Sequence, residues 1–213
     1  MITKPKKDAW AACAASIIHN LEKRNMEGYY FENSHACLEK LTSLLPAGAT
    51  VSWGGSETLK ECGLMQTLQQ GNYTLIDRSM AQTPEESRLL YSKAVLSQYF
   101  FMSSNAITAK GELVNIDGSG NRVACLISGP EQVIVIVGMN KITTDIPSAI
   151  ARIRNVAAPI NVQRLDKETP CHATGLCEDC FSPQCICNQL VITRRSGQKG
   201  RIKVFLIGEE LGY

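Results

Sequence analysis

The chain has 213 residues, of which 44% are hydrophobic and 20% are charged, and its formal net charge at pH 7 is +2. This is the composition of a soluble globular protein, and so small a net charge argues against nucleic acid or a membrane surface as the partner. No apolar run reaches the roughly 18 residues that span a bilayer, and the basic N-terminus leads into an amphipathic helix, not a signal peptide. We therefore expect a single cytoplasmic domain over residues 1–213.

The first half of the chain alternates between helices and strands. Apolar residues at helical spacing predict a first helix over residues 6–25. Strands are predicted at 29–31, 49–53, 73–77 and 99–102, with helices at about 34–44, 57–62 and 83–98. A cap, a first-turn proline and a glutamate three residues after the cap mark the start of the last helix at Thr83. This alternation predicts an α/β fold whose sheet is mostly parallel and covered by helices on both faces.

The pattern changes after Asn105. We predict strands at 112–116 and 122–127, joined as a hairpin by the sequence DGSGN at 117–121. A fully buried strand follows at 132–137, and then a helix at 147–156 that Asp145 caps. Two further strands are predicted at 190–193 and 202–207. The basic loop between them, 194–201, is interpreted as a solvated hairpin tip.

Three segments that directly follow strands carry groups suited to a ligand. Ligands of open parallel sheets bind beyond the carboxyl ends of the strands, so residues 54–56, 103–105 and those after 137 are predicted to converge on one cleft. Glycine backbone and a serine hydroxyl at the first segment can donate to an anion, although a tight turn with a serine cap explains the same residues. Asp117 either faces the ligand or forms a turn at the hairpin tip. The candidate ligand-binding residues are Gly54, Gly55, Ser56, Asn105, Asn115, Asp117, Asn121 and Arg122.

No sequence motif identifies a reaction. The chain has no recognisable nucleophilic triad, no Walker A sequence and no glycine fingerprint that opens a helix. The candidate residues offer mainly hydrogen bonds, which suits a small organic anion such as a carboxylate or a phosphorylated metabolite. Whether the protein is an enzyme, and which residues would be catalytic, therefore stays open.

Nine cysteines are present, and five of them fall between residues 171 and 187 in the spacing C-x5-C-x2-C-x4-C-x-C. Without a secretion signal, we expect these thiols to be reduced. Closely spaced thiolates can bind zinc tetrahedrally or hold an iron–sulfur cluster. The alternative is a thiol-rich loop without metal.

Four stretches of sequence resemble the LUD-domain family, which includes lactate utilisation protein C and YkgG-type (DUF162) proteins of bacteria. They are SWGGSETL at 52–59, NAITAKGELVNIDGSGNRV at 105–123, GPEQVIVIVGMNKI at 129–142 and RIKVFLIGEELGY at 201–213. The resemblance implies a three-layer α/β/α fold like the NagB/RpiA/CoA-transferase group. It also implies a link to lactate oxidation beside iron–sulfur partner proteins. By the same resemblance, the metal ligands would be Cys171, Cys177, Cys180 and Cys187.

One stretch departs from the lactate-utilisation branch, which carries a TADAAIAETGT-like sequence where this chain has SSNAITAKGELVN. We therefore expect a small organic anion in general, not lactate in particular. Two alternatives are a NagB-like enzyme acting on a sugar phosphate or acyl group, and a non-catalytic iron–sulfur or zinc subunit for redox chemistry or assembly. A homodimer is the expected oligomeric state.

Overall fold

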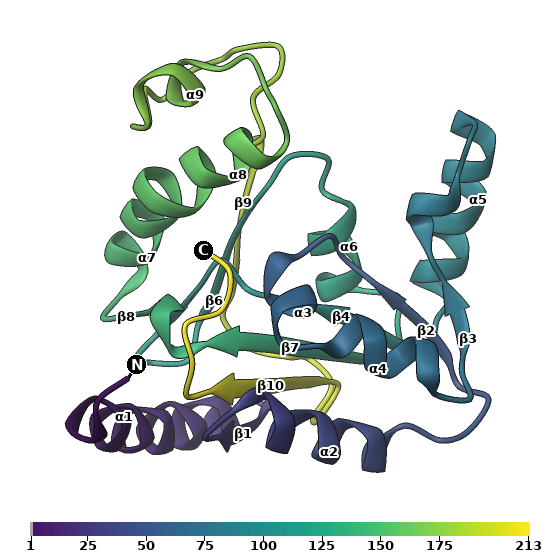
Figure 1. The fold of residues 1–213 in the computed structure, drawn as a ribbon, viewed down its shortest axis with the longest axis vertical. Helices are drawn as coiled ribbons and strands as arrows, with labels where there is room; N and C mark the ends of the chain where they lie inside the picture. Colours follow the sequence, from purple (N-terminus) through teal and green to yellow (C-terminus); the bar gives the residue numbers. More distant parts are fainter. Residues whose placement is uncertain (1) are drawn as a thin grey trace.

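The computed structural model describes residues 2–213 of the chain (Figure 1). The helices are α1 (Lys4–Lys23), α2 (Ser34–Leu44), α3 (Glu57–Glu61), α4 (Leu64–Gln70), α5 (Pro84–Val95), α6 (Asn121–Ile127), α7 (Ile146–Arg152), α8 (Ala158–Arg164) and α9 (Pro170–Thr174). The strands are β1 (Glu27–Phe31), β2 (Thr50–Trp53), β3 (Thr74–Ile76), β4 (Tyr99–Met102), β5 (Ala106–Thr108), β6 (Leu113–Asp117), β7 (Gln132–Gly138), β8 (Ile142–Thr143), β9 (Gln189–Thr193) and β10 (Ile202–Ile207). No helix among the described residues is both long enough and apolar enough to cross a membrane.

The strands form two sheets. The central sheet has six parallel strands in the order β1-β10-β7-β4-β2-β3. A second sheet has the order β8-β5-β6-β9, in which β6 is antiparallel to both of its neighbours. Strands buried on both faces are mostly apolar, which explains the sequences QVIVIVG of β7 and IKVFLI of β10.

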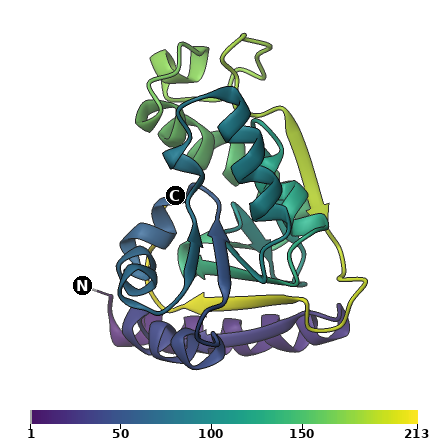
Figure 2. The ribbon, with the colours of Figure 1, turned by 90° about the vertical axis from the view of Figure 1, so that its right-hand side faces the viewer.

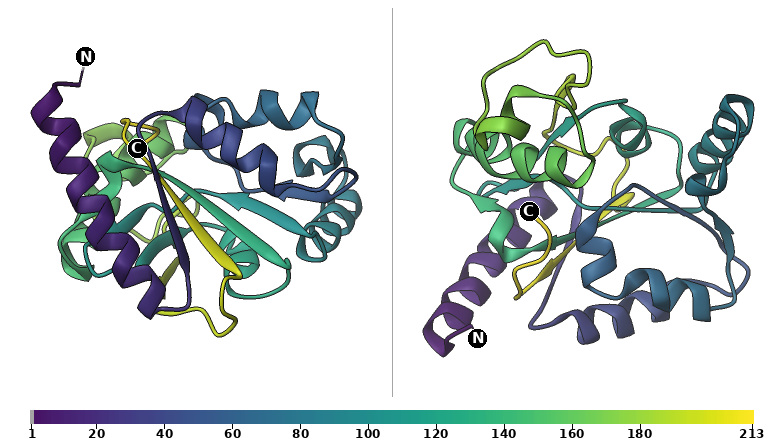
Figure 3. Two further views of the ribbon diagram at one scale, coloured as in Figure 1. Left: turned by 90° about the horizontal axis from the view of Figure 1, so that it is seen from below. Right: turned by 45° about the horizontal axis from the view of Figure 1, so that its top comes forward.

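Helices cover the central sheet on both faces, so the fold is a three-layer α/β/α arrangement. Alternate residues of β7 belong to different cores: Val133 and Val135 pack with α1 and α6, whereas Ile134 and Ile136 pack with α2, α3 and α4. Figure 3 shows the helices on either side of the strands when the sheet is seen from below. A third, smaller core joins the second sheet to α7. The expected fold class is thereby confirmed.

The strand predicted at residues 122–127 is wrong, because Asn121–Ile127 is helix α6. The apolar run after a hairpin-like turn suggested a strand, but the buried residues Val123 and Leu126 have helical spacing. Gly120 precedes the helix with a φ of 80°, a left-handed conformation that glycine adopts without strain. The strand that pairs with β6 on the side away from β5 is therefore not the next segment but β9, about 75 residues later.

The hairpin predicted between β9 and β10 is also wrong, because the two strands belong to different sheets (Figure 2). The segment that links them packs onto the body of the protein at Ser196 and Arg201. Arg201 is only 8% exposed and donates hydrogen bonds to three carbonyl oxygens, those of Cys125, Leu126 and Pro130. A basic residue that sequence reasoning placed at a solvated tip thus joins α6 to the central sheet.

The carboxyl ends of β2, β4, β7 and β10 lie at one edge of the central sheet because these strands are parallel. Residues 54–56 follow β2, residues 103–105 follow β4, and the chain after β7 continues through a short 3-10 turn, Met139–Lys141. The C-terminal residues follow β10 and end between α3 and the pair α7 and α8 (Figure 3). The fold therefore brings four loops together at the edge where a ligand was expected.

Candidate functional site

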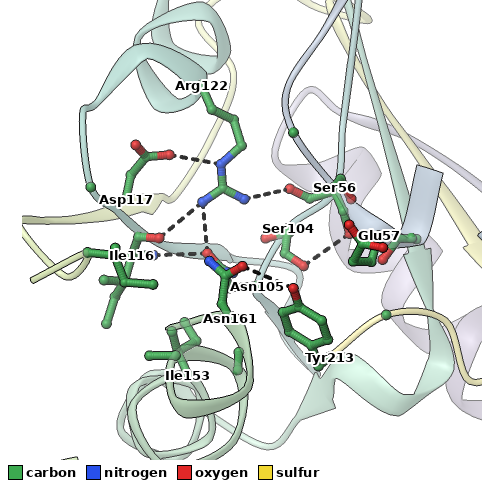
Figure 4. A pocket seen from close by; sticks show the side chains of 18 of the residues that line it. Ser56, Glu57, Ser104, Asn105, Ile116, Asp117, Arg122, Ile153, Asn161 and Tyr213 are labelled. Atoms are coloured by element: carbon green, nitrogen blue, oxygen red, sulfur yellow. Dashed lines mark hydrogen bonds and ion pairs between the residues drawn. The ribbon is translucent and has the colours of Figure 1, made fainter. Parts of the chain in front are cut away.

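A pocket of about 320 Å³ opens at this edge of the sheet (Figure 4). Its walls come from the loops after β2 and β4, the end of β6, the start of α6, helix α8 and the C-terminus. Six of the eight candidate residues line it: Gly55, Ser56, Asn105, Asp117, Asn121 and Arg122. Gly54 lies behind the wall, where a Cβ would meet Arg122 Cγ at 3.1 Å, and Asn115 is fully buried beneath it.

Arg122 holds the loops around the pocket together. Its guanidinium donates to Asp117 Oδ2 at 2.9 Å and to Asn105 Oδ1 at 2.9 Å. It also donates to the carbonyl oxygens of Ser103 and Ile116, each at 3.1 Å. A guanidinium has five N–H groups, so these four bonds leave one for a ligand. Arg122 is therefore mainly a scaffold of the site, with one donor to spare.

Asp117 has both of its oxygens occupied. Oδ1 accepts from the backbone N–H of Gly120 at 2.7 Å, and Oδ2 accepts from Arg122 Nε at 2.9 Å. The first bond is the turn-forming contact that the sequence allowed, although the turn connects β6 to α6 and does not belong to a hairpin. A carboxylate with both oxygens bonded is poorly placed to act as a base, so Asp117 fixes the geometry of the wall.

Asn105 and Asn115 tie the β4–β5 loop to β6. Asn115 Oδ1 accepts from the backbone N–H of Asn105 at 3.2 Å, and Asn105 Oδ1 accepts from Ile116 N at 3.1 Å. Asn115 Nδ2 is buried and has no hydrogen-bond partner among residues 2–213. The two amides thus position the pocket floor, and only Asn105 reaches the surface of the cavity.

Ser56 precedes α3, but its side chain makes no capping hydrogen bond. The hydroxyl therefore stays available at the pocket wall. Helix α3 has only five residues, so its dipole contributes little to an anion site. The hydrogen-bond donors that remain after β2 are therefore the Ser56 hydroxyl and the nearby backbone N–H groups.

Lys141 is a pocket residue that the sequence analysis missed. It is 4% exposed, and its Nζ donates to Thr58 Oγ1 at 2.7 Å and to Ser103 Oγ at 3.2 Å. No carboxylate of the described chain forms an ion pair with it. The sequence did contain a signal: a lysine that comes three residues after the end of the most buried strand.

The pKa of Lys141 is lowered from 10.5 to about 7. Burial is the main cause because it disfavours the charged form, and the positive charges of Arg152 and Arg122 add to it. Glu61 acts in the opposite direction but less strongly. Near neutral pH the amine of Lys141 is therefore present in both protonation states.

The charges around the pocket do not cancel. Arg122 pairs with Asp117 at 2.9 Å, and Arg164 pairs with Glu57 at 3.3 Å, which leaves Lys141 as the unpaired charged side chain among the described lining residues. Behind the wall, Arg152 donates only to carbonyl oxygens, those of Asn105 and Asn140. The pocket is therefore electropositive when Lys141 is protonated.

The clustered cysteines line a second cavity, of about 390 Å³, between α8, α9 and the segment before β9. All five are free thiols, and burial together with the neighbouring Cys185, Cys177 and Cys171 raises the pKa of Cys187 to about 12. No group of three or more possible metal ligands is assembled within the described residues. Thiolates are suitable ligands for zinc or an iron–sulfur cluster. The sulfur atoms would nevertheless have to move closer together to bind either. Ala158, Ile186 and Cys187 form a wall shared by both cavities.

Comparison with known proteins agrees with this architecture. The model of the LUD domain family matches residues 14–207. A DUF162 family protein from Deinococcus radiodurans has a similar structure, with a TM-score of 0.54 and 9% sequence identity over 93% of this chain and 98% of that chain. A ribose 5-phosphate isomerase from Plasmodium falciparum matches more weakly, with a TM-score of 0.32 and 15% identity over 52% of both chains. No curated protein sequence matches the chain significantly.

Proposed function

Since the chain belongs to the LUD domain family, which is related to lactate utilisation proteins, we propose that its pocket binds a small organic anion, either a carboxylate or a phosphorylated metabolite. The observation that carries the proposal is Lys141, a buried basic group that forms no ion pair within the described chain. Unpaired buried charge is costly, and proteins ordinarily place a counter-charge beside it. A bound anion would provide that counter-charge.

The other groups of the wall suit the same ligand. Ser56 offers a hydroxyl that caps nothing, and Arg122 retains one N–H after its four bonds within the protein. Both lie at the surface of the pocket with Lys141. A volume of about 320 Å³ is at the small end of the range for ligand sites, which favours a metabolite of a few carbon atoms.

We expect titration calorimetry to detect binding of at least one of lactate, glycerol 3-phosphate and inorganic phosphate. Lys141→Met should weaken that binding by about ten- to a hundredfold, because a charge-assisted hydrogen bond contributes about 1.5–3 kcal/mol. The matched control is Lys203→Met, because Lys203 lies on β10 outside the pocket and pairs with Glu27. Binding should be accompanied by proton uptake, since an anion raises the pKa of Lys141. Absence of heat with the whole panel, or equal affinity in both variants, would contradict the proposal.

A second function is favoured by the cavity that the five clustered cysteines line. We propose that Cys171, Cys177, Cys180 and Cys187 hold zinc or an iron–sulfur cluster, either of which would fix the wall that the two cavities share. A cluster would also suit the chain to exchange electrons with iron–sulfur partner proteins. The binding energy of the metal would have to offset deprotonation of the thiols and the movement of the loop.

Metal analysis after anaerobic purification should find about one zinc ion, or one cluster, per chain. A cluster would give a brown protein with visible absorption, and zinc would give a colourless one. The double variant with Cys177→Ser and Cys180→Ser should lose the metal, whereas Cys13→Ser on α1 should keep it. A metal-free native protein whose clustered thiols all react with a thiol reagent would rule the site out.

A further inference from the structure

As long as no counter-anion lies beside it, the geometry around Lys141 favours a neutral amine. Thr58 Oγ1 donates its own hydrogen to the carbonyl of Leu211, and Ser103 Oγ donates its hydrogen to the carbonyl of Ser104. Both hydroxyls must therefore accept from Lys141 Nζ, at 2.7 and 3.2 Å. A neutral amine has two hydrogens, so both are used, and its lone pair stays free. An ammonium group would have a third N–H with no carboxylate beside it.

This arrangement is typical of an activated nucleophile. An amine reacts with a carbonyl only when it is unprotonated, and enzymes obtain such a lysine by burying it or by placing other cations beside it. Both causes act here, because Lys141 is buried and the positive charges of Arg152 and Arg122 disfavour its protonation. The amine lines a cavity large enough for a small ligand.

We propose that Lys141 is the nucleophile of this pocket and that its Nζ forms an imine with the carbonyl group of a small anionic oxo compound. This inference rests on the proposed binding of an anion in the same pocket. The ligand class is a metabolite with a carbonyl group and a carboxylate or phosphate, such as a 2-oxo acid or a phosphorylated ketone. Its anionic group would be attracted by Arg122 and Arg152, and its carbonyl carbon would meet Lys141.

The step balances without any further reagent. The lone pair of Nζ forms a bond to the carbonyl carbon, and the carbonyl π electrons move to the oxygen, which takes up a proton as Nζ releases one. Loss of that oxygen as water, with the second proton of Nζ, gives the C=N bond. Ser103 and Thr58 lie within hydrogen-bond distance of Nζ and can relay these protons. One amine and one carbonyl compound thus give one imine and one water.

Reductive trapping tests the proposal. The protein is incubated with sodium cyanoborohydride and either pyruvate or dihydroxyacetone phosphate, and the adduct is located by mass spectrometry of the peptides. We expect modification of Lys141 well above that of any other lysine, and a rate that rises as the pH increases from 6 to 8. An adduct with pyruvate alone would identify a 2-oxo acid site, and one with dihydroxyacetone phosphate alone would identify a phosphorylated ligand.

The controls separate this proposal from anion binding itself. Lactate and glycerol 3-phosphate have no carbonyl group and should bind without forming an adduct. Lys141→Arg keeps a cation but loses the nucleophile, so its adduct should disappear, whereas Lys203→Arg should react like the unmodified chain. If Lys141→Arg does not fold, the peptide map of the unmodified chain still identifies the reactive lysine. If pyruvate or dihydroxyacetone phosphate binds in calorimetry without an adduct on Lys141, the imine is ruled out and the anion site is retained. If neither binding nor an adduct is detected, both the imine and the anion site are ruled out.

Discussion

Replacing Lys141 by methionine is expected to stabilise the protein, by a few kcal/mol at pH 6 and by progressively less toward pH 10. Methionine is unbranched, and it fills the space of the lysine stem without a charge. Thr58 and Ser103 still donate to the carbonyls of Leu211 and Ser104 after the exchange, so no buried hydroxyl loses its acceptor. The variant therefore removes the cost of burying the charge and loses only the two hydrogen bonds that these hydroxyls accept from Lys141.

The pH dependence follows from the pKa of Lys141, which is 10.5 for an unperturbed lysine and about 7 in the fold. Below pH 7 both the folded and the unfolded chain carry the proton, so the full cost of burial is present. Between pH 7 and about 10.5 the unfolded chain binds a proton that the folded chain has released, and stability rises with pH. Each unit of pKa shift corresponds to about 1.4 kcal/mol. The free energy of unfolding of Lys141→Met should therefore lack this rise between pH 7 and about 10.5.

Urea unfolding at pH 6, 8 and 10 measures the effect, with the same exchange at Lys203 as the control. Lys203 Nζ is 2.9 Å from a carboxylate oxygen of Glu27, so its loss should be neutral or slightly destabilising, with no such slope. A loss of stability in Lys141→Met at pH 6 would mean that the lysine is satisfied by the fold, and would remove the main support for an anion site. A gain would mean that the chain keeps Lys141 at the expense of stability, as is common for functional residues.

The elements that the sequence predicted well depend on local interactions. Helix α5 begins where the capping pattern placed it, with Thr83 Oγ1 accepting from Glu86 N at 3.1 Å. Asp145 caps α7 in the same manner, through Ser148 N at 2.8 Å. The strands β4, β7 and β10 were found because burial on both faces makes them almost entirely apolar. In each case the signal lies within a few residues of the element.

The errors concern partners that are distant in the sequence. Residues 122–127 were paired with the preceding strand because Asp117–Asn121 resembles a hairpin turn, but β9 occupies that place. The strands β9 and β10 are close in the chain and lie in different sheets. Local patterns cannot distinguish these arrangements, because the outcome depends on which strand completes the sheet edge.

The same limit applies to the site. The convergence of residues 54–56 and 103–105 follows from a general rule for parallel sheets, and the structure places both segments at one pocket. The role of Lys141, by contrast, depends on its contacts with Thr58 and Ser103, which are 83 and 38 residues away in the chain. A buried lysine and an exposed one look alike in a sequence. The individual roles of Asn115 and Arg122 were likewise visible only from their contacts.

The second large effect is expected at Arg122, where methionine should destabilise the protein by about 3–5 kcal/mol. Methionine retains the stem that packs against Gly54, but it removes the donor of four hydrogen bonds. The most costly of these losses is at the carboxylate of Asp117, which is only 8% exposed. The control is Arg195→Met, because Arg195 is exposed and makes no ion pair within the described chain; we expect a change within about 0.5 kcal/mol.

A double-mutant cycle separates the charge pair from the rest of the scaffold. Arg122→Met should cost less in a chain that already carries Asp117→Asn, because a neutral amide is then left unpaired in place of a carboxylate. Urea unfolding of the four proteins gives the coupling energy, which we expect to be on the order of 1–3 kcal/mol. Additive effects would mean that the ion pair contributes little and that the bonds to Ser103, Asn105 and Ile116 hold the loops. Since those bonds also shape the pocket, ligand affinity should then fall with Arg122→Met alone and stay unchanged with Asp117→Asn.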